Sequence, residues 1–119
     1  MLPAIFVSHG SPMLAIEDAE ARQFLATLPE ILPERPKAIL MISAHWERLR
    51  PAVSAPPANE TIHDFGGFPP ALYQIQYPAP PSADLARRVA ELLGASGLPT
   101  DIDQRRGLDH GAWVPLMVA

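Results

Sequence analysis

The chain has 119 residues, of which 48% are apolar, so it is long enough to build one hydrophobic core. Its formal net charge of -4 contains no run of basic residues, which argues against a nucleic-acid-binding surface. It has no cysteine, which excludes disulfides, thiolate nucleophiles and Cys-ligated metals, so any metal must be held by His, Asp or Glu.

The first half of the chain predicts a strand, a helix and a second strand. Residues 4–8 form a short β-rich run, and residues 16–32 carry apolar side chains at helical spacing until Pro29 ends the helix. Residues 37–43 are typical of a fully buried strand. Because such a unit normally makes a right-handed parallel crossover, we expect an α/β fold of βαβ units with a mostly parallel sheet.

The second half begins with a long irregular segment, residues 50–81, rich in proline. Structureless loops longer than about 15 residues are uncommon unless they are functional, so its centre, "IHDFGGFPPALY", is a candidate functional loop. A helix is predicted from the N-cap Ser82 to Gly94, followed by a short strand in residues 98–103. "GLDHGAW" then leads into an apolar run at which the chain stops, so we expect a part of a larger protein.

Membrane insertion and secretion are not indicated by the sequence. No apolar stretch reaches the roughly 18 residues that a membrane span needs, and the first residues lack the basic segment of a signal peptide. We therefore expect a cytoplasmic protein.

Two of the four histidines, His9 and His45, follow the ends of the two predicted parallel strands. Ligands of open α/β sheets bind at this edge, and two imidazoles there could approach one metal ion. The alternative is that each histidine is a hydrogen-bonded loop residue. Spacing alone leaves both interpretations open.

The other two histidines lie in clusters with glycine and aromatic residues. His63 stands in "HDFGGFP", where Phe65 and Phe68 could form an aromatic wall over a pocket or simply pack a tight Gly-Gly turn. His110 in "LDHGAW" could act as an acid or base oriented by Asp109, or Asp109 could be the N-cap of a last helix.

Four further side chains lie beside the histidines. Trp46 and Trp113 could form pocket walls or belong to the core. Ser8 and Ser11 in "SHGSP" resemble a nucleophile only superficially, because the G-x-S-x-G elbow is missing and no Asp is placed to orient His9.

Five motifs in this order, "SHGSP", "SAHW", "HDFGGFP", "YPAP" and "DHGAW", resemble the class III extradiol ring-cleavage dioxygenases, in the DOPA-dioxygenase-like branch of the LigB-type family. The resemblance implies that residues 1–119 are the N-terminal part of a single α/β domain, with a metal site at the C-terminal strand ends. It implies non-haem Fe(II), with zinc sometimes in its place. By the same resemblance, His9 and His45 match metal ligands.

By this resemblance His110 and His63 match catalytic or pocket positions. Phe65, Phe68 and Trp113 are the expected substrate contacts because aromatic side chains beside the histidines could form the pocket wall. The third metal ligand and a further catalytic histidine lie outside this chain in the family, so the 119 residues alone are expected to be inactive.

The implied activity is the opening of a DOPA-like catechol ring by O2, with no nucleic-acid or membrane partner and with a homo-oligomer compatible with the sequence. Two alternatives remain open. A tetrapyrrole metal chelatase is one, because "HGS" after a first strand also occurs there; a non-catalytic zinc-binding domain is the other.

Overall fold

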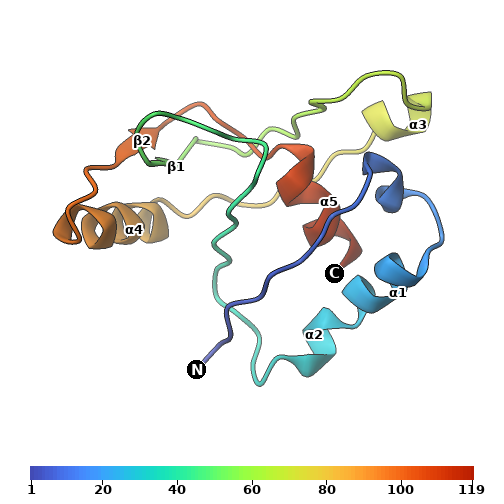
Figure 1. Cartoon of the computed structure of the whole chain (residues 1–119), viewed down its shortest axis with the longest axis horizontal. Helices are drawn as coiled ribbons and strands as arrows, with labels where there is room; N and C mark the ends of the chain where they lie inside the picture. Colours follow the sequence, from blue (N-terminus) through green and yellow to red (C-terminus); the bar gives the residue numbers. More distant parts are fainter.

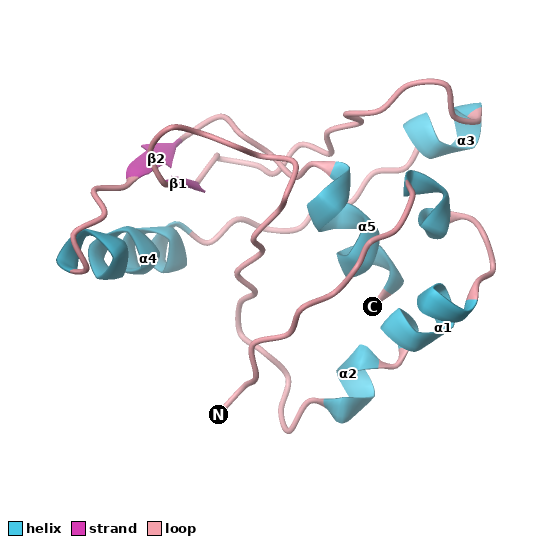
Figure 2. Ribbon diagram, viewed as in Figure 1, coloured by secondary structure: helices cyan, strands magenta, loops and turns pink.

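The computed structural model describes all 119 residues, arranged as short helices and a small parallel sheet of two strands. Helix α5 lies at the centre of Figure 1, with α4 and the strand pair to one side and α1, α2 and α3 to the other. Loops make up much of the chain between these elements, as Figure 2 shows. The elements in chain order are η1 (Pro12–Ala15), α1 (Glu20–Ala26), α2 (Leu28–Ile31), β1 (Ala52–Ser54), α3 (Pro70–Tyr73), α4 (Ala83–Ala95), β2 (Asp101–Asp103) and α5 (His110–Val118).

The sheet is parallel, as the sequence predicts, and the fold is α/β. β1 pairs with β2 in the register Ala52 to Asp101, and an isolated parallel bridge joins Thr61 to Leu108 further along the same two segments. The predicted strand at residues 98–103 is confirmed in its last three residues. β1 lies inside the segment that the sequence predicts to be irregular, so that prediction was wrong for Ala52–Ser54.

Residues 4–8 and 37–43 do not form the predicted strands. They make no backbone–backbone hydrogen bonds and run as plain traces in Figure 1, in blue and teal. Several of their apolar side chains remain open to solvent, with Phe6 97% and Ile42 91% exposed, while Val7 and Met41 are half-buried. An apolar run forms a buried strand only when its backbone groups form hydrogen bonds with neighbouring strands, and here no neighbouring strand pairs with either run.

The helix predicted within residues 16–32 is divided into α1 and α2 at Thr27, whose hydroxyl donates to the carbonyl of Phe24 at 2.7 Å. Pro29 does not end the helix as predicted. It lies in the first turn of α2, where a backbone N–H would have no hydrogen-bond partner within the helix, so proline is tolerated there.

Helix α4 is capped as predicted, because the Ser82 hydroxyl accepts a hydrogen bond from the backbone N–H of Leu85. The helix passes through Gly94 and ends at Ala95, one residue beyond the predicted end. The turn that follows uses Gly97 in the left-handed region, at φ +85°, where other residues are strained.

The hydrophobic core surrounds α5. Trp113 and Val114 are fully buried and pack with Leu14, Leu25 and Leu72 from the helices around them. The Trp113 indole donates to the carbonyl of Ile62 at 2.9 Å, which satisfies its only polar atom. This burial holds the N-terminus of α5, and therefore His110, at a defined place in the fold.

None of the helices combines the length and the apolar character needed to cross a membrane.

Asp103 organises the turn between β2 and α5. One carboxylate oxygen accepts the backbone N–H groups of Arg105 and Arg106, both at 2.8 Å, and the Arg48 guanidinium lies 3.4 Å from the other. These hydrogen bonds, with the nearby arginine charges, hold the pKa of Asp103 below its usual value. The ionised carboxylate is therefore the form that stabilises this turn.

The first prediction concerns the replacement of this carboxylate by Asp103→Asn. Because the folded-state pKa lies below the unfolded value of 3.8, the stabilisation is complete above that pH and is lost as the pH falls through the folded-state pKa. We expect a lower Tm for the variant at pH 7 and a smaller difference from the parent at pH 3. Thermal unfolding of both proteins checks this, with Glu34→Gln as an exposed carboxylate control.

Candidate metal centre

Three imidazoles from distant parts of the sequence converge on one point. The Nε2 atoms of His9 and His45 lie 2.9 Å apart, and a ring nitrogen from each of His9, His45 and His110 falls within 4.8 Å of the others. The ring centroids are separated by 4.2 to 5.0 Å. The sequence paired His9 with His45, but nothing in its spacing placed His110 beside them.

Each imidazole reaches this point from a different kind of local structure. His9 precedes Gly10, which turns the chain at φ +60° into the short helix η1. His45 lies in the turn after residues 37–43. His110 is the first residue of α5 and is only 6% exposed, whereas His45 is open to solvent. The cluster therefore has one buried side and one open side.

The nitrogen spacing fits a shared metal ion. Metal–imidazole bonds are about 2.0–2.1 Å long, so two nitrogens on one ion lie about 3.0–3.4 Å apart, depending on the bond angle. The 2.9 Å between His9 and His45 is close to the lower end of this range. Nδ1 of His9 is buried without a hydrogen-bond partner, so the only polar contact of that ring is made by Nε2, at the cluster. These three residues could hold a metal ion.

Electrostatics favour the neutral imidazole at His9. Burial, together with the neighbouring imidazoles of His110 and His45, lowers the pKa of His9 below its usual value. A metal ion binds only the unprotonated nitrogen, so the environment favours the form that can act as a ligand.

Asp64 orients His110. Its Oδ1 atom accepts both the backbone N–H of His110 and the imidazole Nδ1–H, each at 2.9 Å. Burial alone would raise the pKa of Asp64, but these hydrogen bonds from His110 outweigh it and hold that pKa below the usual value. With Nδ1 acting as the donor, Nε2 of His110 carries the lone pair that faces the other two imidazoles.

The orienting role that the sequence analysis gave to Asp109 therefore belongs to Asp64. Asp109 does hold the N-cap position of α5, yet its carboxylate makes no capping hydrogen bond. Asp64 accepts the N–H at the start of that helix instead. Its position directly after His63, in the loop already singled out, was the one available signal for this residue.

Gly111 allows α5 to approach the segment that carries His45. A Cβ atom at this position would lie 2.6 Å from Ser43 Oγ and 2.8 Å from a ring carbon of His45. Real Cβ atoms do not come this close to other heavy atoms, so any larger residue would push the two segments apart. The glycine of the "DHGAW" motif is therefore a packing requirement of the site.

An aromatic group lies against the buried side of the cluster. The ring of Phe65 packs edge-on against His110, with 5.6 Å between centroids, and Phe68 packs against Phe65 at 5.4 Å. The hydroxyl of Tyr73 donates to the carbonyl of Phe65 and accepts the N–H of Phe68, which pins the loop. Gly67 makes this turn with φ +76°.

The remaining two predicted site residues do not reach the cluster. The Nε2–H of His63 donates to the carbonyl of Ile75 at 2.8 Å, and its ring packs against Phe65, Tyr73 and Trp113. Trp113 itself is fully buried in the core, which is the packing alternative considered for it from the sequence.

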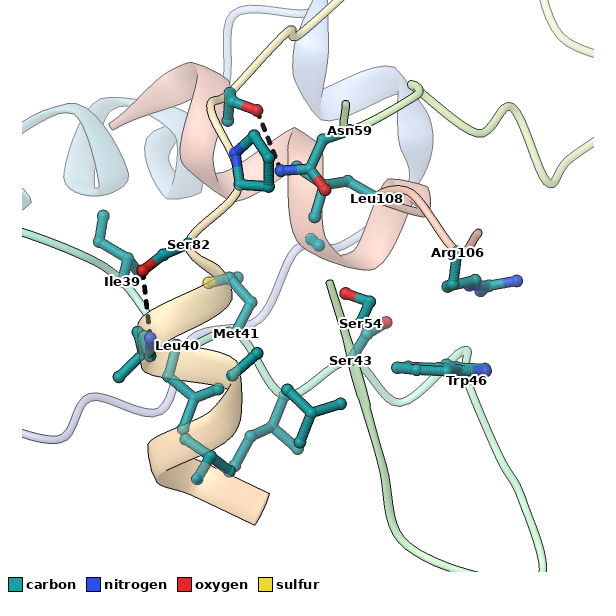
Figure 3. Close-up of a pocket in the computed structure, with 18 of the residues that line it drawn as sticks. Ile39, Leu40, Met41, Ser43, Trp46, Ser54, Asn59, Ser82, Arg106 and Leu108 are labelled. Carbon is teal, nitrogen blue, oxygen red and sulfur yellow. Dashed lines mark hydrogen bonds between the residues drawn. The ribbon is translucent and has the colours of Figure 1, made fainter. Parts of the chain in front are cut away.

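A separate cavity of about 1090 Å³ lies between residues 37–43, β1 and α4, shown in Figure 3. None of the three clustered histidines lines it. Apolar side chains cover much of its wall, including Ile39, Met41, Val53, Leu85, Val89 and Leu93.

The sequence of this chain was compared with known protein families and curated proteins. Residues 3–119 match the family described as the catalytic LigB subunit of aromatic ring-opening dioxygenase. This chain belongs to the LigB family. The resemblance inferred from five motifs is thereby confirmed over almost the entire sequence.

Curated relatives of this LigB-family chain carry one recurring name. It is 53% identical over 116 residues to a "4,5-DOPA dioxygenase extradiol" from Beta vulgaris, covering 95% of this chain and 43% of the relative. Proteins with the same name from Mirabilis jalapa and Escherichia coli (strain K12) are each 47% identical, over 94% of this chain and 43% and 41% of their own lengths. The chain thus spans less than half of each relative.

The second prediction tests the close approach at Gly111. Gly111→Ala is expected to destabilise the fold by about 1–3 kcal/mol, because its methyl group displaces Ser43 and His45. The matched control is Gly94→Ala in α4, where a Cβ would meet nothing within 4 Å. Alanine there should be neutral or stabilising by up to about 1 kcal/mol. Equal effects of the two substitutions in urea unfolding would contradict this account.

Proposed function

We propose that the full-length protein is an extradiol dioxygenase that opens the ring of a DOPA-like catechol with O2. The observation that carries this proposal is the convergence of His9, His45 and His110 in a chain of the LigB family. The recurring name of its relatives supports a catechol substrate of this kind. Both oxygen atoms would enter the product, a muconic semialdehyde.

His9 and His45 are assigned as metal ligands, and iron(II) as the active metal, with zinc able to take its place. Imidazole suits both ions, and these two neutral ligands leave the full positive charge of the metal to balance an anionic substrate. When bound, the metal would supply the Lewis acidity that lowers the pKa of a catechol hydroxyl and an open position for O2. A third protein ligand is assigned to the part of the family domain outside residues 1–119.

His110 is assigned as a catalytic acid or base rather than as the third ligand. Asp64 holds its Nδ1–H, so Nε2 can accept a proton from a phenolic hydroxyl or donate a hydrogen bond once protonated. His110 is only 6% exposed, so the surrounding residues restrict the position of its ring. The Asp64 carboxylate would stabilise the imidazolium formed in such a step.

Phe65 and Phe68 are assigned as the aromatic wall of the substrate pocket. Phe65 already packs edge-on against His110, so a catechol ring entering beside that histidine would meet an apolar surface. His63, predicted to be catalytic, is assigned here to holding this wall through its bond to Ile75. Trp113, predicted to contact substrate, is fully buried and is assigned to supporting the wall from the core.

The two alternative functions are less well supported. A tetrapyrrole chelatase needs an open face wide enough for a porphyrin, whereas Phe65 and the buried His110 close one side of this cluster. A non-catalytic zinc domain is less well supported because residues 3–119 match a family described as the catalytic LigB subunit of aromatic ring-opening dioxygenase. The cytoplasmic location and a homo-oligomeric state stay predictions.

The third prediction separates ligands from catalytic groups in the full-length protein. His9→Ala and His45→Ala should each reduce bound iron to a small fraction and abolish turnover. His110→Ala should keep its iron within about threefold of the parent and lose about 10²- to 10⁴-fold in kcat. Anaerobic Fe(II) loading, metal analysis and the yellow colour of the ring-opened product measure these quantities.

The control for this experiment is Glu47→Ala, an exposed neighbour of the "SAHW" motif with no hydrogen-bond partner. It should leave iron content and turnover unchanged. If His110→Ala loses iron as completely as His45→Ala, His110 is a ligand and the assignment fails. If the iron-loaded parent opens no catechol while it binds zinc stoichiometrically, the non-catalytic alternative replaces the proposed reaction.

A further inference from the structure

A buried carboxylate lies next to the cluster without a hydrogen bond to any of its imidazoles. Asp109 is 3% exposed, and both of its oxygens are used: Oδ1 accepts the hydroxyl of Ser43 at 2.7 Å, and Oδ2 accepts the guanidinium of Arg106 at 2.9 Å. A charge buried this deeply costs several kcal/mol unless it is paired and hydrogen-bonded. Asp109 is therefore held firmly in one orientation.

The hydroxyl that donates to Asp109 also accepts a bond from the metal-site segment. Ser43 Oγ receives the backbone N–H of His45 at 3.1 Å, so one oxygen atom connects the turn that carries His45 to the residue preceding His110. We call this pair of hydrogen bonds the Ser43–Asp109 bridge.

The bridge matters because the segment that carries His45 has few other attachments. Residues 33–47 make no backbone–backbone hydrogen bond. Apart from the bridge, the only hydrogen bond from the turn is the imidazole contact between His45 and His9. Apolar packing is weak there too, since Ile42 is 91% exposed. A segment with so few contacts is expected to sample several positions unless a polar contact selects one.

A second contact reinforces the same end of the bridge. The guanidinium that pairs with Asp109 stacks over Trp46, the residue after His45, at 5.4 Å from the ring centroid. Figure 3 shows Arg106 and Trp46 lying one above the other, with Ser43 beside them. Asp109 thus acts on both sides of His45, through Ser43 before it and through Arg106 after it.

We infer that Ser43 and Asp109 are positioning residues that set where His45 stands relative to His110, and thereby set the affinity and geometry of the metal site. This inference rests on the proposed metal site but not on the proposed reaction. Outer hydrogen-bond partners of metal ligands typically change metal affinity by about 10- to 100-fold. Here the partner holds the backbone of the ligand rather than its ring.

The fourth prediction is a Co(II) titration of the full-length protein and its variants, with visible absorption as the readout. Ser43→Ala should weaken Co(II) binding by about 10- to 100-fold and change the ligand-field spectrum, since His45 no longer has a fixed position. Ser43→Thr keeps the hydroxyl and should restore binding to within about threefold of the parent.

Two further variants make this titration decisive. Ser54→Ala is the matched control, because it removes a hydroxyl from β1 that makes no hydrogen bond, and it should leave the spectrum unchanged. Arg106→Gln removes the other partner of Asp109 at a side chain that is 25% exposed, so folding should tolerate it even if Ser43→Ala does not. A weakening of about 3- to 10-fold is expected, with folding checked by circular dichroism.

The inference is overturned if the folded Ser43→Ala and Arg106→Gln variants keep the parent affinity and spectrum, or if Ser43→Thr is as weak as Ser43→Ala. Either result leaves the proposed reaction untouched, because the parent would still bind metal and could still open a catechol. Conversely, a parent that binds Co(II) but shows no ring cleavage with iron contradicts the reaction alone.

Discussion

The structure depends on the burial of α5 on every side. Its first six residues, His110 to Pro115, are all buried, so the surrounding segments must pack around it rather than beside it. Leu14, Leu25 and Leu72 do so through apolar contact with Trp113 and Val114. The site follows from this constraint, because the only polar side chain in that buried stretch that can bind a metal, His110, stands at the helix start.

The approach of other segments to this helix start is controlled by small and polar residues. Gly111 removes the side chain that would otherwise separate α5 from the turn holding His45. Asp64 satisfies the first backbone N–H of the helix and the imidazole with the same oxygen. Packing, helix capping and histidine orientation are therefore parts of a single local structure, which explains why "HDFGGFP" and "DHGAW" occur together in one sequence.

The sequence predicted the proximity of His9 and His45, but not the structure of the segments that precede them. His9 and His45 follow short apolar runs, and this local pattern was enough to place both near one point, although neither run became a strand. Strand formation depends on hydrogen-bond partners that no local pattern reports. For the same reason β1 was missed, since its three residues stand among prolines and are defined by their pairing with Asp101–Asp103.

The spacing of residues along the sequence could not predict the role of Asp64, for a related reason. It acts on a histidine 46 positions away, while Asp109 directly precedes that histidine and was the natural candidate. A residue that precedes a histidine in the sequence need not contact its imidazole at the start of a helix. The backbone of Asp109 leads into α5, and its side chain is directed toward Ser43 instead of toward His110. Contacts between loops of this kind become visible only once the core has fixed where the helix begins.

The exposed segments 4–8 and 37–43 have a consequence for handling this polypeptide. Their backbone N–H and C=O groups are unpaired, and large apolar side chains such as Phe6 and Ile42 face the solvent. Such stretches readily pair with copies of themselves from other molecules. Expressed without further sequence, these 119 residues would therefore self-associate through two segments that lie just before His9 and His45, and aggregation would make the same imidazoles inaccessible to a metal ion.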